Sequence, residues 1–177
     1  MILLGIGSNL PSKFGDRFKN IDLAISNLVE KNIKLIKKSS FYETLSYPDN
    51  SKPKFINVVI QILTKLEPQD LASALLSIEE KLERKRRFKN DPRTCDIDII
   101  DYDNKILNFK CGNLDFSVPH DKISYRNFVL FPLREILPDW KHPKTKESIN
   151  LLIDKLSKND KNSILKIKKP WYDKIML

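Results

Sequence analysis

Two aspartates separated by a single residue are the clearest chemical feature of the sequence. Asp96 and Asp98 lie within residues 92–102, whose β-branched content predicts a strand. Side chains alternate along a strand, so both carboxylates share one face, with Cα atoms roughly 7 Å apart, while Ile97 and Ile99 point into a core. Two carboxylates this close repel each other, and a cation is the usual remedy. The spacing therefore predicts a site for a pair of divalent metal ions that clamp a phosphoryl group, although a polar strand face facing water would show the same pattern.

A run of basic residues leads directly into this strand. Residues 84–93 contain six Lys or Arg side chains and one acid. Such a run is usually only a solvated surface, but beside paired carboxylates it is what a polyphosphate needs. The formal net charge of +9 also indicates an anionic partner, either a nucleic acid or a phosphorylated small molecule. The sequence has no Gly-x4-Gly-Lys-Ser/Thr motif, so a nucleotide must be held mainly by side chains and metal.

Length and composition favour one globular domain. The 177 residues are 41% hydrophobic and 31% charged, and no apolar run approaches the ~20 residues that span a membrane. The first residues lack the pattern of a signal peptide. Cys95 and Cys111 are too few for a disulfide framework or a zinc site, which fits a reducing cytoplasm. We expect a cytoplasmic protein with one domain, residues 1–177, in which the lysine-rich residues 141–177 form an extension packed on the rest.

The elements that must position the acidic and basic residues follow in the order strand, helix, strand, strand, helix, strand. This order predicts an α+β, ferredoxin-like split βαβ sandwich with C-terminal additions. In that fold an antiparallel sheet has both helices on one face, and we expect a cleft on its open face. After residue 104 we expect an irregular region, then an amphipathic helix near residues 149–156 and a short strand near 163–167. The other predicted ranges are strands 2–7, 33–42, 55–62 and 92–102, a helix over 15–31 and a helix that starts at Pro68.

Several blocks of residues, taken together, resemble those of the 6-hydroxymethyl-7,8-dihydropterin pyrophosphokinase family of folate enzymes. They keep the family's order and nearly its spacing over about residues 2–140. The block from Pro92 to Ile99 is specific, whereas the turn from Gly7 to Leu10 would be weak alone. The blocks are Gly7-Ser8-Asn9-Leu10, Ser40-Phe41-Tyr42-Glu43-Thr44, Phe55-Ile56-Asn57, Ile78-Glu79, Pro92-Arg93-Thr94-x-Asp96-Ile97-Asp98-Ile99, Val118-Pro119-His120, Arg126-x-Phe128 and Phe131-Pro132-Leu133.

The resemblance implies a reaction and a set of catalytic residues. The terminal pyrophosphate of ATP, the co-substrate, would pass to the hydroxymethyl group of the pterin, with release of AMP. Asp96 and Asp98 would ligate two Mg²⁺ ions, which need few protein oxygens because phosphate and water supply the rest. Arg84, Arg86 and Arg93 would hold phosphate oxygens.

The resemblance also implies how the substrates are bound. Phe55 and Phe128 would sandwich the flat pterin, while Asn57 and the backbone near Thr44 and Tyr47 would bind its polar edge. The implied partners are small molecules only, with no nucleic acid and no membrane, and the implied state is a monomer. The implied nucleotide contacts are Glu79, Arg84, Arg93, Ile99, Ser117, His120 and Arg126.

The chain departs from the family pattern in its basic segment. It is one residue shorter before Pro92 and has Asn90 and Asp91 where a tryptophan-glycine pair is common. This leaves open which arginines of residues 84–87 contact phosphate. Phe55 replaces the usual tyrosine but keeps the aromatic ring.

Two other functions fit parts of the sequence. A two-metal nucleotidyltransferase or nuclease would use the same carboxylates on a polynucleotide. An RNA-binding ferredoxin-like module would use the positive charge and aromatic residues on the sheet. Against the RNA-binding module, the third predicted strand lacks an RNP1-type pattern, and two aspartates on the sheet face would repel a phosphate backbone without a metal.

Overall fold

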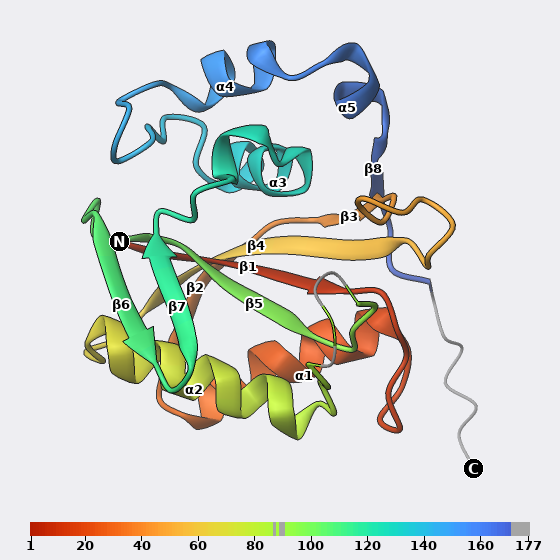
Figure 1. Cartoon of the computed structure of the whole chain (residues 1–177), viewed down its shortest axis with the longest axis vertical. Helices are drawn as coiled ribbons and strands as arrows, with labels where there is room; N and C mark the ends of the chain where they lie inside the picture. The colour runs from red at the N-terminus through yellow and green to blue at the C-terminus, as the bar shows by residue number, and fades with distance from the viewer. Residues whose placement is uncertain (87, 89–90, 171–177) are drawn as a thin grey trace.

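The computed structural model describes residues 1–86, 88 and 91–170. Within these residues the chain forms a six-stranded antiparallel sheet and a separate two-stranded hairpin, with helices on both faces of the sheet (Figure 1). The α+β class and the ferredoxin-like order of the first elements are as predicted.

An apolar strand, β1 (Ile2–Ser8), lies inside the sheet. It pairs with β4 (Phe55–Leu63) on one side and with β5 (Asp96–Tyr102) on the other. Six of its seven residues are buried, as expected for a strand covered on both faces. Because β5 lies at the end of the strand order, one of its edges has no strand partner in the described sheet.

The single strand predicted over residues 33–42 is wrong in one respect, because the structure divides it into two. β2 (Lys34–Lys38) and β3 (Phe41–Thr44) pair with different parts of β4. Between them the Ser39 backbone N–H donates to the Val59 carbonyl at 2.9 Å, and the Ser39 hydroxyl accepts from the Val59 N–H at 3.0 Å. The serine hydroxyl thus takes the place of one backbone acceptor, which interrupts the regular pairing. β3 also pairs with β8 (Ile164–Ile167), close to the strand predicted near the end of the chain.

Two helices cover one face of the sheet and enclose the first core. α1 (Arg17–Glu30) and α2 (Pro68–Lys81) lie side by side under the sheet (Figure 1). α1 begins after Asp16, whose side chain accepts from the Lys19 N–H, and α2 begins with a proline in its first turn. Their apolar faces pack on the sheet residues that include Ile97 and Ile99. Both helices match the predicted positions.

Helices cover part of the opposite face of the sheet, which was expected to be open. α3 (Asn127–Ile136) and α4 (Ile149–Lys155) lie above it (Figure 1). They form a second core with Leu3, Val59 and Ile100 of the sheet. α4 confirms the amphipathic helix predicted near residues 149–156. A short helix, α5 (Lys158–Asn162), then leads into β8.

The region after residue 104 is more regular than predicted. It contains a hairpin of β6 (Leu107–Cys111) and β7 (Leu114–Val118), a short 3₁₀ helix (Ile123–Tyr125) and then α3. Pro132 lies inside α3, although proline disfavours a helix interior. The helix forms nevertheless, because six apolar side chains of the helix other than the proline are buried or packed in the second core. These residues are Phe128, Val129, Leu130, Phe131, Leu133 and Ile136.

The end of β5 is tied to the C-terminal segment by a buried carboxylate. Asp101 is fully buried, and it accepts from the Trp140 indole N–H at 2.8 Å and from the Asn104 backbone N–H at 2.8 Å. Burial raises the pKa of Asp101, although both hydrogen bonds oppose this rise. No helix in the part of the chain that the structure describes has the length and apolarity to cross a bilayer.

Replacing the indole donor should weaken this attachment. In Trp140→Phe the ring volume is largely kept, but the buried Asp101 carboxylate loses one of its two donors. We expect the free energy of unfolding to fall by about 1–3 kcal/mol, the cost of leaving a buried polar group unsatisfied. Urea unfolding followed by far-UV circular dichroism measures this change. An unchanged midpoint would show that the hydrogen bond does not stabilise the fold.

Candidate functional site

The paired aspartates project from one face of β5. Asp96 lies opposite Gly7 of β1, and Asp98 lies opposite Gly5. The intervening Ile97 is 4% exposed and points into the first core. The alternation predicted for this strand is therefore present. Because the two opposing residues are glycines, the neighbouring strand places no side chain beside either carboxylate.

Arginines from three separate segments pair with these carboxylates. Arg84 donates to Asp96, and the Arg93 Nε atom lies 2.8 Å from the second oxygen of Asp96. Arg126 donates to Asp98 at 3.1 Å. The positive charges expected around the acidic pair thus come from the end of α2, the start of β5 and the start of α3.

The two carboxyl groups differ in pKa. Burial raises the pKa of both, but at Asp96 the guanidinium groups of Arg93 and Arg84 outweigh burial and hold the pKa below its usual range. At Asp98 burial and the nearby charge of Asp96 together raise the pKa, and the positive charges around it compensate only in part. Two arginines thus compensate the charge of Asp96, whereas the repulsion that Asp98 feels from Asp96 is compensated only in part.

A buried glutamate of α2 organises the arginines. Glu79 is 1% exposed, and it accepts from Arg84 and, at 2.5 Å, from Arg86. It also accepts from the Ile97 backbone N–H at 2.7 Å, so it satisfies a donor on the edge of β5 that has no strand partner. Burial raises its pKa, which the charges of Arg84 and Arg86 oppose. Both carboxylate oxygens of Glu79 are thus bound by donors of the protein. Direct contact between Glu79 and a nucleotide remains a prediction.

A cavity of about 250 Å³ lies in front of the acidic pair, between α2, β5 and the β6–β7 hairpin. Five of the seven residues predicted to contact a nucleotide line it, and the other two, Arg93 and Arg126, pair with the carboxylates. Ser117 donates to Asn108 across the hairpin at 2.9 Å. Burial lowers the pKa of His120, which the charge of Asp98 opposes. The five lining residues are Glu79, Arg84, Ile99, Ser117 and His120.

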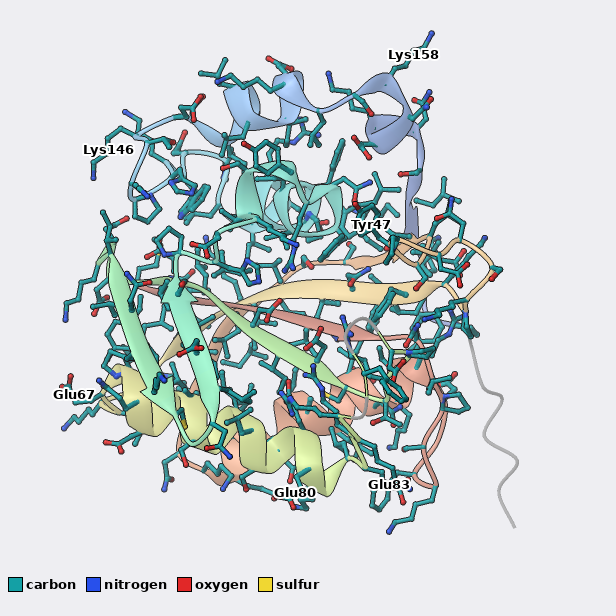
Figure 2. The ribbon with its side chains drawn as sticks, viewed as in Figure 1. Tyr47, Glu67, Glu80, Glu83, Lys146 and Lys158 are labelled. Atoms are coloured by element: carbon teal, nitrogen blue, oxygen red, sulfur yellow. The ribbon has the colours of Figure 1, made fainter. Side chains whose placement is uncertain are left out.

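The polar residues predicted to bind a pterin edge come from two neighbouring strands and the loop after β3. The Asn57 amide donates to the Thr44 hydroxyl at 3.0 Å, and both residues are buried. Tyr47 lies in the loop and is 82% exposed (Figure 2). The structure therefore joins Asn57 to Thr44, while the Tyr47 side chain faces solvent.

The two aromatic residues predicted to sandwich the pterin each face an arginine of the acidic cluster. The Arg93 guanidinium lies 5.2 Å from the centroid of the Phe55 ring. The Arg126 guanidinium lies 5.4 Å from that of Phe128. Such cation–π contacts stabilise an arginine over a ring by about 0.5–1 kcal/mol at exposed sites. The same two arginines therefore link the aromatic residues to the carboxylates.

The last residues of β1 make a larger contribution than their weak motif indicated. A Cβ atom at Gly7 would lie 3.0 Å from the Asn57 side-chain oxygen and 3.5 Å from the Phe55 ring. A larger residue at position 7 would therefore crowd the Asn57 amide, while the Phe55 ring would stay at ordinary contact distance. The signal in the sequence was the glycine directly after a buried apolar run.

Arg87, Lys89 and Asn90 of the basic run lie outside the described residues. Of the arginines before them, Arg84 faces the acidic pair and Arg86 pairs with Glu79.

The acidic pair suits magnesium better than a metal that needs an all-protein cage. The described residues contain no group of three or more His, Cys, Asp or Glu side chains that could hold a metal ion. Mg²⁺ is commonly bound by one or two carboxylates, with substrate phosphates and water as the other ligands. Asp96 and Asp98 fit that donor set because phosphate oxygens would complete it.

Taken together, the fold and site define a class of protein. The edge strand of a ferredoxin-like sheet bears two carboxylates that pair with arginines, and two of these arginines lie over aromatic rings. This arrangement suits an enzyme that transfers phosphate groups with a metal. A planar acceptor between Phe55 and Phe128 remains a prediction.

The chain belongs to the 7,8-dihydro-6-hydroxymethylpterin-pyrophosphokinase (HPPK) family, whose model matches residues 3–138. The 2-amino-4-hydroxy-6-hydroxymethyldihydropteridine pyrophosphokinase of Aquifex aeolicus is 36% identical over 142 residues, which are 80% of this chain and 83% of that protein. The folic acid synthesis protein fol1 of Pneumocystis carinii is 35% identical over 93% of this chain, which spans only 21% of that protein's length.

Solved structures show the same fold. The wild-type HPPK-DHPS of Plasmodium falciparum superposes with a TM-score of 0.66 at 17% identity. The match covers 87% of this chain and 43% of that one, so this chain spans less than half of the solved protein.

Removing the charge of Glu79 should weaken nucleotide binding. Glu79→Gln keeps the size of the side chain but takes a buried counter-ion from Arg84 and Arg86, which are then held less firmly in front of the cavity. We expect affinity for a non-hydrolysable ATP analogue to fall by at least about tenfold, measured by isothermal titration calorimetry.

Glu80→Gln is the matched control for this variant. Glu80 is the next residue of α2 and projects into solvent (Figure 2), so its replacement should leave affinity unchanged. Equal affinity of the Glu79 variant and the wild type would show that the arginines do not depend on this glutamate.

Proposed function

We propose that this chain transfers the terminal pyrophosphate of ATP to the hydroxymethyl group of 6-hydroxymethyl-7,8-dihydropterin and releases AMP, in folate synthesis. Membership of the HPPK family and the names of the relatives support this reaction. The observation that carries it is that two arginines join the acidic pair to the aromatic rings. Arg93 pairs with Asp96 and lies over the Phe55 ring, and Arg126 pairs with Asp98 and lies over the Phe128 ring. A phosphate donor bound at the aspartates and a planar acceptor bound at the rings would therefore be neighbours.

Asp96 and Asp98 would hold Mg²⁺, and two ions are proposed because the triphosphate has several charges to neutralise. When bound, the metal would withdraw charge from the phosphate oxygens and so favour displacement at phosphorus. Arg84, Arg86 and Arg93 would hold phosphate oxygens as catalytic residues. The arginines that now pair with the carboxylates can turn to the phosphates, because each guanidinium has several donors in a planar fork.

The cavity in front of β5 would take the nucleotide. The cavity is lined by Glu79, Ile99, Ser117 and His120, which supports this assignment. Arg126, next to Asp98, would close on the phosphates from the α3 side. Water must be kept from the reacting phosphorus, because hydrolysis of ATP would otherwise compete with transfer.

The acceptor would lie with its flat ring against Phe55 and Phe128. Asn57 would bind the polar edge of the pterin together with the backbone near Thr44 and Tyr47, since an amide both donates and accepts. The hydroxymethyl oxygen would attack the β-phosphorus of ATP, and the bond from that phosphorus to the α-phosphate oxygen would break to release AMP. The hydroxyl proton would pass to Asp96 or Asp98, while positioning and charge neutralisation would supply most of the rate.

The same proposal extends to organisation and location. We propose that residues 1–177 form one pyrophosphokinase domain, with residues 141–177 as an extension, and that the chain acts as a monomer on small molecules. A cytoplasmic location is proposed because Cys95 and Cys111 are free thiols, which suits a reducing compartment.

The reaction can be tested with the purified chain, ATP, MgCl₂ and 6-hydroxymethyl-7,8-dihydropterin. We expect AMP and the pterin diphosphate in equal amounts, measured by chromatography, and no product after chelation with EDTA. Formation of ADP, or AMP formation without the pterin, would contradict the proposal.

Asp98→Asn tests the role of the acidic pair. It removes one anionic oxygen but keeps the shape of the side chain, so the fold should survive. We expect turnover to fall by about 100-fold or more, since charge stabilisation by a metal amounts to several kcal/mol. Asp154→Asn, on the exposed face of α4, is the control and should be fully active. Mg²⁺-dependent activity at the wild-type level in Asp98→Asn would exclude a metal role for this residue.

Phe55→Ala tests the acceptor site separately from the nucleotide site. Loss of the ring removes a stacking surface, so we expect pterin affinity to fall by about tenfold or more, with affinity for the ATP analogue within about threefold of wild type. Calorimetry with each ligand measures both. Phe14→Ala, at a partly exposed ring on the surface, should change neither, and unchanged pterin affinity in Phe55→Ala would refute stacking at this position.

A further inference from the structure

A buried asparagine in the turn after β1 has no role in the reaction as described so far. Asn9 is 1% exposed, although its amide is strongly polar. A buried amide is retained only when its donor and acceptor are both satisfied. The partners of Asn9 come from two loops that are far apart in the sequence.

The acceptor side of Asn9 holds the backbone of Arg93. The Arg93 N–H donates to the Asn9 side-chain oxygen at 2.6 Å. In return, the backbone N–H groups of Asn9 and Leu10 donate to the Arg93 carbonyl at 3.0 and 3.1 Å. Both polar groups of the Arg93 backbone are therefore bound by this turn, three residues before Asp96.

The donor side of Asn9 holds the segment that leads into Phe55. The Asn9 amide donates to the Pro53 carbonyl at 3.0 Å. Two residues later the Phe55 ring lies 5.2 Å from the Arg93 guanidinium. One side chain thus links the Arg93 backbone to the segment that leads into Phe55.

The turn itself is attached firmly to α1. Asn20 is fully buried, and its amide donates to the Leu10 carbonyl at 2.9 Å. Its side-chain oxygen accepts from the Ser12 hydroxyl at 2.6 Å. Asn9 is therefore presented from a rigid base rather than from a free loop, so it can set the position of what it binds.

We propose that Asn9 is a positioning residue that fixes the distance between the phosphate-binding arginine and the acceptor-stacking ring. This inference rests on the proposed function, since it assigns Arg93 to the donor and Phe55 to the acceptor. The two substrates react only when their reacting atoms are held at near-contact distance, and a small displacement costs much of the rate. Loss of the Asn9 side chain thus affects the reaction of the bound substrates more than the binding of either one.

Two substitutions separate the two sides of the amide. Asn9→Ala removes both side-chain bonds. We expect kcat at saturating substrates to fall by at least about tenfold, while the Kd of each substrate measured alone stays within about threefold of wild type. Asn9→Asp is isosteric and keeps the acceptor for Arg93 but loses the donor to Pro53. We expect a smaller loss of kcat than in Asn9→Ala, again with little change in the Kd of the pterin.

Asn27→Ala is the matched control. Asn27 is a buried asparagine of α1 that lies outside the site, and its amide donates to the Leu23 carbonyl at 2.7 Å. Its loss should lower stability but leave kcat within about twofold of wild type. A kcat of Asn9→Ala within threefold of wild type, or equal losses of kcat in the two alanine variants, would overturn the inference. If Asn9→Ala does not fold, an unchanged kcat in Asn9→Asp overturns it.

Amide hydrogen exchange tests the link without turnover. In Asn9→Asp the Arg93 amide should keep its protection, while Lys54 and Phe55 exchange faster; in a folded Asn9→Ala the Arg93 amide should also exchange faster. Unchanged exchange at these positions would overturn the inference. A wild-type chain that forms no AMP from ATP in the presence of the pterin would instead overturn the proposed function, and the exchange experiment tells the two failures apart.

Discussion

The repulsion between two carboxylates on one strand face is the constraint on which the rest of the site depends. Asp96 and Asp98 are close because the strand alternates, and no local rearrangement can separate them while β5 is paired with β1. Positive charge must therefore be brought to them. Arg84, Arg93 and Arg126 supply it, from parts of the chain that are not neighbours along the sequence. In the proposed reaction, Asp96 and Asp98 would hold Mg²⁺, and the guanidinium groups would then be available to phosphate oxygens.

Arginine side chains are long and flexible, so their guanidinium groups must also be held in position. Glu79 does so for Arg84 and Arg86 through a carboxylate that is almost fully buried. Its third bond, to the Ile97 N–H, also fixes the edge of the strand that bears the aspartates. On the other side of the site, the turn at Asn9 binds the Arg93 backbone. Breaking either support would leave a charged or polar group buried without its partner, which is why such groups are costly to change.

The second core explains why a sheet of this fold does not act as an open platform. RNA-binding modules of similar order use the free face of the sheet for base stacking. Here α3 and α4 pack on that face through Leu3, Val59 and Ile100. Arg126, directly before α3, pairs with Asp98 and lies over the Phe128 ring, so the start of this helix joins the second core to the acidic pair. The geometry favours a small, enclosed substrate over a long nucleic acid.

The sequence by itself determined the order of the first elements, the face shared by Asp96 and Asp98, and the family. These follow from local periods of two and 3.6 residues and from short blocks of fixed spacing, which need no knowledge of distant contacts. It did not reveal the break at Ser39, where a hydroxyl replaces a backbone acceptor, or helix α3, which forms around Pro132 because its apolar residues are buried in the second core.

Only the tertiary structure decided which groups meet in the site. Asn9 reaches Arg93 across 84 positions and Arg126 reaches Asp98 across 28, so no pattern in the intervening residues encodes these contacts. Packing of α2 on β5 makes Glu79 the counter-ion of two arginines, a role that the sequence pattern did not indicate. Long-range contacts depend on how whole elements pack and which polar groups are buried together, and that balance is settled only when the chain is folded.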